Sequence, residues 1–226
     1  MKRIFLAFLF CLSAASLSAQ TSVGIRGGYS TSSFSYIPAL NIRSISVDGL
    51  SNPTFALVIE HFNAKNAGVE VNFQYLGTGF SQTIADTEGV ISTNETELNY
   101  LKVPVLASFF VGRSGRFQIK FGPHLGYLLS ANDVIREFSE STPPEIPTYG
   151  GAGDNPKKLM YGLSAGAGIS KLFGKSTIAG EVRFGYEFTN PESQERIFDM
   201  NFTTLEFSLA YLFRIRESKI PKIVKQ

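Results

Sequence analysis

Only a few residues have the types and spacing that phosphate binding or hydrolysis would require. Gly174-Lys175-Ser176 matches the end of a phosphate-binding loop, but that loop needs a glycine five positions before Gly174, where the chain has Ile169. Such a loop also holds phosphate at the N-terminus of a helix, whereas strands are expected on both sides of this segment. We therefore predict a tight β-turn here and no phosphate site.

His124 is the histidine that lies in the middle of an expected strand. With Ser164 or Glu181 it could form a triad in which the imidazole activates a serine nucleophile. The expected strands offer no strand-to-helix turn that would expose the serine as a nucleophile elbow. We favour a hydrogen-bonded position inside the protein for His124, and a lipid- or peptide-modifying enzyme centred on it is the alternative.

Metal and cofactor chemistry has little support in the sequence. The chain has two histidines, one cysteine and no EF-hand spacing, so we predict neither a metal site nor a cofactor. Solvated charge is favoured over weak cation capture for the acidic residues of the expected loops, which are Asp86, Glu88, Glu137, Glu140, Glu145 and Asp154.

The first residues predict export. Two basic residues precede an apolar run at residues 4–12, and small and polar residues follow as far as Ala19. This layout is typical of a cleaved secretory signal peptide at residues 1–19, with a cut after Ala15 as the alternative position. The competing interpretation is a buried helix at the N-terminus of a soluble protein.

The charge balance after such a cut limits the partners. Removing residues 1–19 takes away Cys11, Lys2 and Arg3, which lowers the 21 basic residues to 19 against 19 acidic residues. A neutral chain without a run of Lys and Arg predicts no nucleic-acid partner, and a chain without cysteine has no disulfides. We expect one barrel domain at residues 20–214 and a basic periplasmic tail at residues 215–226.

Alternation of apolar and polar residues with a period of two recurs along the rest of the chain, which predicts an all-β protein. No later apolar stretch reaches about 18 residues, so a helical membrane span is not expected. Eight antiparallel strands are predicted, at residues 22–36, 54–62, 68–80, 97–111, 116–131, 159–172, 177–189 and 202–214.

The expected connections alternate in length. Short turns are predicted at residues 63–67, 112–115 and 173–176, and long polar loops at residues 37–53, 81–96, 132–158 and 190–201. Outer-membrane barrels have short periplasmic turns and longer extracellular loops. The sequence therefore predicts an up-and-down transmembrane β-barrel in the outer membrane, and a soluble β-barrel or sandwich is the competing fold.

Each expected strand has one apolar face and one polar or small face. Residues such as Val71, Phe73 and Tyr75 alternate with Glu70 and Asn72, and the glycines gather on the polar side. If hydrocarbon covers the apolar side, the charged residues face inward. We predict an interior charge network, with no conducting pore, that contains Arg26, Glu60, Glu70, Lys102, Lys120, Glu181, Arg183, Glu187 and Glu206.

Two prolines lie inside expected strands. Pro104 and Pro123 cannot donate a hydrogen bond to a neighbouring strand, and a closed barrel has no edge on which to place them. We therefore expect a β-bulge at each proline.

Several segments resemble the PorT-like outer-membrane β-barrel family. The most specific is Tyr100-Leu101-Lys102-Val103-Pro104-Val105-Leu106, and similar matches are Gly24-Ile25-Arg26-Gly27-Gly28, residues 68–75, residues 121–127 and residues 162–168. The resemblance covers nearly the whole mature chain and implies an outer-membrane barrel. The family is named after a member associated with protein secretion, so a link to secretion is an alternative to test, but membership implies an outer-membrane barrel and not a secretion factor. The basic tail after Phe213 departs from barrels that end on an aromatic residue.

The favoured function is therefore not enzymatic. We expect a barrel surrounded by outer-membrane lipid whose long loops, above all residues 132–158, contact an unknown protein or glycan. The alternatives are the enzyme centred on His124 and a transporter of small solutes.

Overall fold

The computed structural model describes residues 20–38, 46–64, 66–85, 91–137, 156–189 and 197–216. Within these ranges the chain forms β1 (Gln20–Pro38), β2 (Ser46–Gly49), β3 (Ser51–Phe62), β4 (Ala67–Ala85), β5 (Ile91–Gly112), β6 (Gly115–Arg136), β7 (Leu159–Phe173), β8 (Ser176–Glu187) and β9 (Ile197–Arg216). No helix in the described ranges is long and apolar enough to cross a membrane. The predicted signal peptide, residues 1–19, lies outside these ranges.

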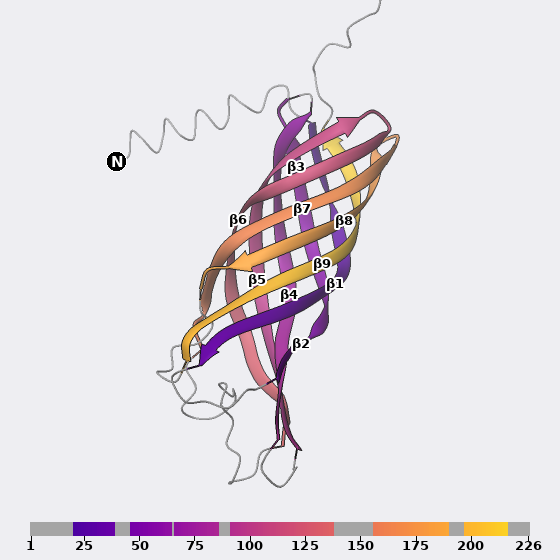
Figure 1. Cartoon of the computed structure of the whole chain (residues 1–226). Helices are drawn as coiled ribbons and strands as arrows, with labels where there is room; N and C mark the ends of the chain where they lie inside the picture. The colour runs from indigo at the N-terminus through magenta and orange to yellow at the C-terminus, as the bar shows by residue number, and fades with distance from the viewer. Residues whose placement is uncertain are drawn as a thin grey trace, which may run out of the picture.

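The strands close into a ring (Figure 1). Neighbours run in the order β4-β3-β1-β9-β8-β7-β6-β5, and β5 pairs again with β4. All of these pairings are antiparallel, including the one between the first and last strands, where Gly24 lies opposite Leu212. The prediction of an eight-stranded antiparallel barrel is confirmed. In a closed ring the backbone N–H and C=O groups of the strands hydrogen-bond to neighbouring strands. Strands in a bilayer need this because hydrocarbon offers no hydrogen-bond partners.

The short strand β2 shares one place in the ring with β3. Between them, the Leu50 amide donates to the Gly79 carbonyl on β4, and the Ser32 amide on β1 donates to the Leu50 carbonyl, both over 3.1 Å. β2 then pairs with β4 at residues 80–83. The nine strand segments therefore occupy eight positions around the barrel.

The short turns all lie at one end of the barrel, which we call the turn end (Figure 1). They connect β3 to β4, β5 to β6 and β7 to β8, and β1 begins and β9 finishes at the same end. Gly112 and Gly174 have φ angles of 117° and 62° there, which only glycine adopts without strain. The segment Gly174-Lys175-Ser176 forms the tight turn that its sequence predicts.

The expected long loops prove shorter at the opposite end, the loop end. β4 continues to Ala85 and β5 starts at Ile91, so only residues 86–90 remain between them, and β6 reaches Arg136. Residues 37–53, expected as one loop, include β2 and the first residues of β3. Together β2 and the loop-side parts of β4, β5 and β6 (residues 81–85, 91–97 and 129–136) form a sheet extension beyond the ring (Figure 1).

The β-bulges expected at Pro104 and Pro123 are absent, and that prediction is wrong. β5 keeps one register with β4 from Phe109 to Ile91, and β6 keeps one register with β7 throughout their pairing. Each proline removes a hydrogen bond toward one neighbour only, and the pairing lapses there for two residues without inserting an extra one. The shifts in register between β5 and β6 occur instead beside Thr96 and Tyr100, toward the sheet extension.

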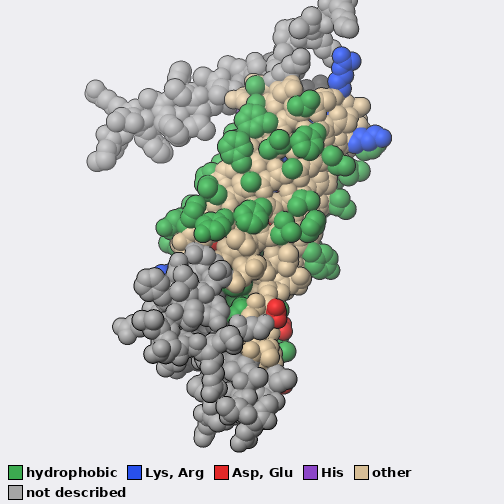
Figure 2. All heavy atoms as spheres, viewed as in Figure 1, with side chains coloured by type: hydrophobic (Ala, Val, Ile, Leu, Met, Phe, Trp, Pro, Cys, Tyr) green, Lys and Arg blue, Asp and Glu red, His purple; other side chains and the backbone are tan. Residues whose placement is uncertain are grey.

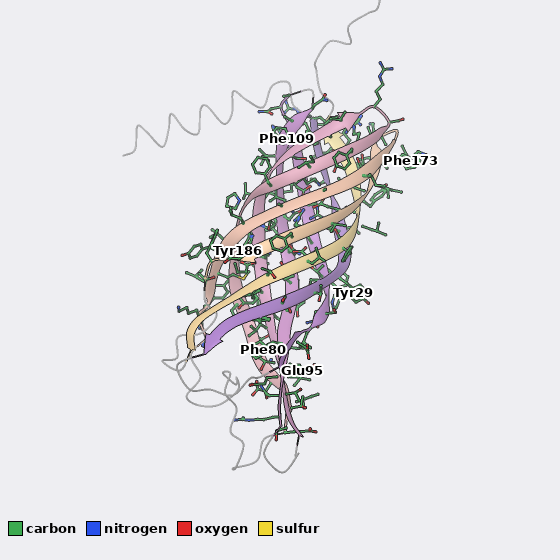
Figure 3. The ribbon with its side chains drawn as sticks, viewed as in Figure 1. Tyr29, Phe80, Glu95, Phe109, Phe173 and Tyr186 are labelled. Atoms are coloured by element: carbon green, nitrogen blue, oxygen red, sulfur yellow. The ribbon has the colours of Figure 1, made fainter. Side chains whose placement is uncertain are left out.

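Apolar side chains cover the outside of the ring (Figure 2). Residues such as Tyr29, Leu57 and Leu209 are between 61% and 70% exposed, although they lie in the middle of long strands. Figure 3 places Phe109 and Phe173 near the turn end of this belt, and Tyr29 and Tyr186 nearer the loop end. An apolar band with aromatic residues near both borders is the surface of a barrel in lipid.

Candidate functional site

Six charged side chains meet in the middle of the barrel and form a charged layer. Glu70 on β4 accepts hydrogen bonds from Arg26 at 2.8 Å, Lys120 at 2.5 Å and Arg183 at 3.0 Å. Glu181 on β8 also receives all three cations, at 3.4, 2.8 and 2.5 Å. Glu60 is the third carboxylate, 3.5 Å from Lys120. Three cations thus face three carboxylates, so the layer is neutral.

A second group of charges lies beside this layer. Lys102 Nζ lies 3.2 Å from Glu187 Oε1 and 3.8 Å from Glu206 Oε1, and all three side chains are at most 1% exposed. Gln74 donates to Glu206 over 2.7 Å. All nine residues of the predicted network therefore lie inside the barrel, and ion pairs connect each of them to another member.

Burial makes these pairs interdependent. Water solvates separated charges strongly, so a charge inside a barrel persists only with close partners and additional hydrogen bonds. The carboxylate of Glu70 has such support, because Asn72 adds a fourth donor at 2.8 Å. Because β1, β3, β4, β6 and β8 each contribute a charged side chain to the layer, its ion pairs can fix the positions of five of the eight strands relative to one another.

His124 lies at the edge of the second group. Its Nδ1 is 2.8 Å from Ser164 Oγ and its Nε2 is 2.5 Å from Glu187 Oε2. Serine, histidine and carboxylate are therefore in contact, with Glu187 rather than the anticipated Glu181 as the acid. All three side chains are at most 2% exposed.

Ser164 also stands in a sequence pattern that our residue analysis did not weigh. Gly162-Leu163-Ser164-Ala165-Gly166 has the Gly-x-Ser-x-Gly spacing of hydrolase nucleophiles. In those enzymes the serine lies on a sharp turn between a strand and a helix, whereas here the five residues continue through the middle of β7. Ser164 therefore lies beside His124, but it is buried in a strand and is not exposed as a hydrolase nucleophile would be.

Apolar side chains fill the interior on the loop side of the charges. This apolar layer, which the sequence analysis missed, consists of Phe34, Leu76, Phe80, Leu98, Tyr100, Leu128, Met160 and Phe202. Its rings are packed, since the centroid of Phe34 lies 5.0 Å from that of Phe80 and 5.2 Å from that of Phe202. Alternation along the strand could have indicated this layer. Leu76 and Phe80 lie on the same inward face of β4 as Glu70, Asn72 and Gln74.

At the turn end of the interior, the rings of Phe62 and Phe110 meet edge to face at 5.1 Å. Phe110 lies opposite the buried Gln118, which donates to Ser170 over 2.8 Å, so this end holds both apolar and polar side chains. Ala56, Val58 and Leu212 are also buried together, and Ala56 lies opposite Arg26 of the charged layer. Buried side chains therefore fill the interior on both sides of the charged layer.

The other candidate residues do not assemble into a site. Among the described residues, no three His, Cys, Asp or Glu side chains lie together as a metal centre would require. Of the loop acids, Glu137 is described and exposed. Asp86, Glu88, Glu140, Glu145 and Asp154 lie outside the described residues.

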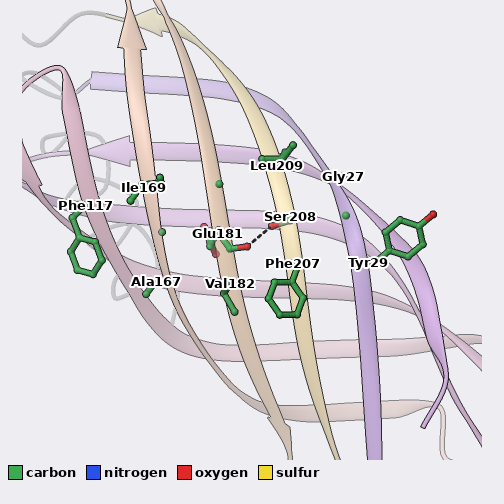
Figure 4. Close-up of a pocket in the computed structure, with 13 residues that line it drawn as sticks. Gly27, Tyr29, Phe117, Ala167, Ile169, Glu181, Val182, Phe207, Ser208 and Leu209 are labelled. Atoms are coloured by element: carbon green, nitrogen blue, oxygen red, sulfur yellow. Dashed lines mark hydrogen bonds between the residues drawn. The ribbon is translucent and has the colours of Figure 1, made fainter.

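The hollows on the molecule belong to its outer, apolar surface. One of about 620 Å³ lies over β1, β7, β8 and β9, where Gly27, Ala167 and Gly180 leave space beneath larger side chains. Figure 4 shows Tyr29, Phe207 and Leu209 around it. Its walls are mostly apolar, and the two polar side chains that line it, Glu181 and Ser208, are buried in the barrel. In a bilayer, lipid chains would fill such a hollow.

A closed ring of eight antiparallel strands, apolar outside and charge-paired inside, defines a transmembrane β-barrel protein. Residues 18–191 match the model of the outer membrane protein beta-barrel domain, and the chain belongs to this family. The match ends before β9, which nevertheless completes the ring by pairing with β1 and β8. The chain is therefore an outer-membrane β-barrel protein.

Solved structures support the fold. The outer membrane protein OprG from Pseudomonas aeruginosa is 11% identical with a TM-score of 0.52, and the match covers 89% of this chain and 99% of that one. The outer membrane protein AlkL is 12% identical with a TM-score of 0.50, over 89% of this chain and 93% of that one. No curated protein matched the sequence. At these identities the likeness concerns the fold alone.

Proposed function

We propose that this protein is a non-enzymatic, non-conducting barrel that presents its loop end to a partner outside the cell. The observation that carries the proposal is the filled interior, in which an apolar layer lies on the loop side of the charged layer and mixed apolar and polar side chains lie on its turn side. Water and ions cross a barrel through an open, polar lumen. A filled lumen instead makes the barrel a rigid support for whatever projects from it.

The sheet extension gives that support a polar outer surface. Asp48, Ser81 and Glu95 lie opposite one another on β2, β4 and β5, and Glu97 lies opposite Asn132 on β6. These carboxylates, hydroxyls and amides suit a polar partner such as a glycan or a protein surface. Binding residues are often found on such projections, because the scaffold positions them without constraining their sequence.

Deleting residues 137–153 tests this function. The deletion joins a site beyond the end of β6 to the segment before β7, so we expect the barrel to assemble and to shift its migration on heating as the parent does. Partners crosslinked to the parent protein in native membranes should disappear from the variant. Partner capture that survives the deletion of residues 137–153 and the replacement of Glu95 and Glu97 by Gln would contradict the proposal.

The resemblance to PorT-like proteins adds a narrower proposal. If this barrel takes part in protein secretion, the crosslinked partners will include components of an export machinery. A partner set consisting only of glycans or host proteins would contradict the secretion link, while leaving a loop-mediated interaction in place.

An enzyme is the second candidate, and the contacts of His124 with Ser164 and Glu187 favour it. Hydrolysis would need His124 to accept the Ser164 proton and substrate to reach the serine. Lipase and peptidase assays on Ser164→Ala and His124→Gln should show no change from the parent. Loss of activity in both variants, with heat-dependent migration intact, would establish catalysis instead.

A further inference from the structure

Basic side chains surround the turn end of the barrel. We call them the basic rim: Arg113, Arg116, Lys171, Lys175, Arg214 and Arg216. Among the described side chains, no exposed Asp or Glu accompanies them. Figure 2 shows Lys and Arg at this end, directly beside the apolar belt.

The loop end has a different balance. Its described basic side chains are Arg136, Lys157 and Lys158, and Asp48, Glu95, Glu97, Asp133 and Glu137 accompany them. The excess of positive charge is therefore specific to the turn end. Solubility alone does not require such a difference, since mixed charges serve it equally well.

The rim cations lie where the apolar belt ends. Lys171 Nζ lies 5.3 Å from the centroid of the Phe173 ring, which is 52% exposed on the belt, whereas the Arg116 guanidinium lies 4.1 Å from the ring of Phe110, which is buried inside the barrel. Nearby Val111 and Ile215 are 72% and 61% exposed. Long basic side chains that border an apolar surface place their charge at the level of the lipid headgroups.

Two rim residues lie close to each other at the mouth of the barrel. The positive charges of Arg116 on β6 and Arg214 on β9 repel each other, and Glu60 is the carboxylate that attracts Arg116. The Nε of Arg214 is buried and donates to no described atom. An anionic group at this mouth would relieve the repulsion and accept the unused hydrogen bond.

We propose that the basic rim binds the phosphate groups of anionic phospholipids in the leaflet that faces the periplasm. The short turns of outer-membrane barrels face the periplasm, so the rim lies at the surface of that leaflet. Basic residues close to an anionic membrane surface each strengthen binding by about fivefold. A polymer of the cell wall would also meet exposed turns, but it would not explain why Lys171 packs on Phe173 of the belt.

Lipid retention in nanodiscs tests this inference. The full-length protein, purified from membranes, is transferred to nanodiscs of equal phosphatidylcholine and phosphatidylglycerol, and native mass spectrometry measures the lipids that stay bound. We expect phosphatidylglycerol to be enriched on the parent protein. The variant R113Q/K171Q/K175Q should lose at least about fivefold of that enrichment. The matched control R136Q/K157Q/K158Q, at the loop end, should keep it.

Three results would overturn the inference: a parent protein that retains lipids at the bulk ratio, an equal loss in both variants, and rim-dependent sedimentation with purified cell-wall sacculi without lipid enrichment. Heat-dependent migration in gels checks that the variants fold. If the rim variant does not fold, a salt titration of the parent decides. Enrichment that persists in about 1 M salt would exclude an electrostatic rim.

Discussion

Glu70 has more ionic partners than any carboxylate outside the charged layer, and it has no contact with solvent. Arg26, Lys120 and Arg183 reach its two oxygens from three other strands. Removing its charge would leave those cations with only Glu60 and Glu181. The cost of an unpaired charge in a buried site exceeds the worth of the pair itself.

Glu70→Gln should therefore destabilise the folded barrel by about 3–5 kcal/mol. The variant keeps the size of the side chain and one acceptor oxygen, so the loss reports on charge rather than on packing. Urea unfolding of the protein in lipid vesicles measures the change.

The matched control is Glu97→Gln, on the outer face of the sheet extension. Surface carboxylates contribute about 0–1 kcal/mol, so its free energy of unfolding should stay close to that of the parent. Equal losses in the two variants would show that the interior charges are not coupled as the contacts indicate.

Parity along each strand indicates on which face a charged residue lies, but it cannot predict which residues pair. Glu70 meets Arg183 because β4 and β8 face each other across the barrel, and that distance depends on strand number and stagger. For the same reason, the acid in contact with His124 is Glu187 and not Glu181, which the sequence analysis named. Both acids lie on the inner face of β8, and only the three-dimensional arrangement selects between them.

At the scale of the strands, the backbone of β9 leaves no space for a side chain at Gly28 on β1. A Cβ atom added to the inward-facing Gly28 would overlap the Phe207 carbonyl and the Cα of Ser208, which are backbone atoms that cannot rotate away. Glycine in a strand commonly marks such an approach.

Gly28→Ala should therefore cost about 1–3 kcal/mol of unfolding free energy, because the two strands must separate where the ring closes. The same unfolding experiment in vesicles measures it. Gly27→Ala is the matched control, since its added methyl would meet only the ring of Phe55 at 3.6 Å, an ordinary contact. A loss at Gly27 as large as that at Gly28 would contradict the close approach.

All eight ring strands could be predicted because apolar residues alternate wherever lipid covers the outside. The ends of the strands could not, because that alternation stops where lipid stops. In the sheet extension Thr93 and Glu95 face outward while Ser92 and Asn94 face inward, so both sides are polar. Such a segment has the composition of a loop although its backbone continues to pair.

At the scale of the whole molecule, the layered interior predicts an insulating barrel. The protein reconstituted in planar bilayers should show no stable conductance steps, because the apolar layer and the charged layer each obstruct the lumen. Phe80→Ala, which opens the loop-side apolar layer, should remain closed because the charged layer still blocks the path.

Steady ohmic channels from the intact parent protein would contradict this prediction and would favour transport of small solutes. The control is an open porin incorporated in the same bilayers, which verifies that insertion is detected. Channels from Phe80→Ala alone would show that the apolar layer is the only effective seal.

The sequence alternation also does not indicate which inward positions are charged and which are apolar. Its inward positions were expected to be polar or small, as in a lumen filled with paired charges. The apolar layer occupies the same parity, and only the position along each strand separates Gln74 from Leu76 or Lys102 from Tyr100. Alternation has no information about depth along the barrel axis, which is why this layer was not predicted.

The burial of the charged layer has a consequence for isotope exchange. Ammonium and guanidinium hydrogens normally exchange with deuterium oxide within moments, yet Lys120 and Arg183 are at most 2% exposed, and the apolar layer covers them on the loop side. These hydrogens can exchange for deuterium only when the barrel opens transiently, so their exchange rate should report how often it opens.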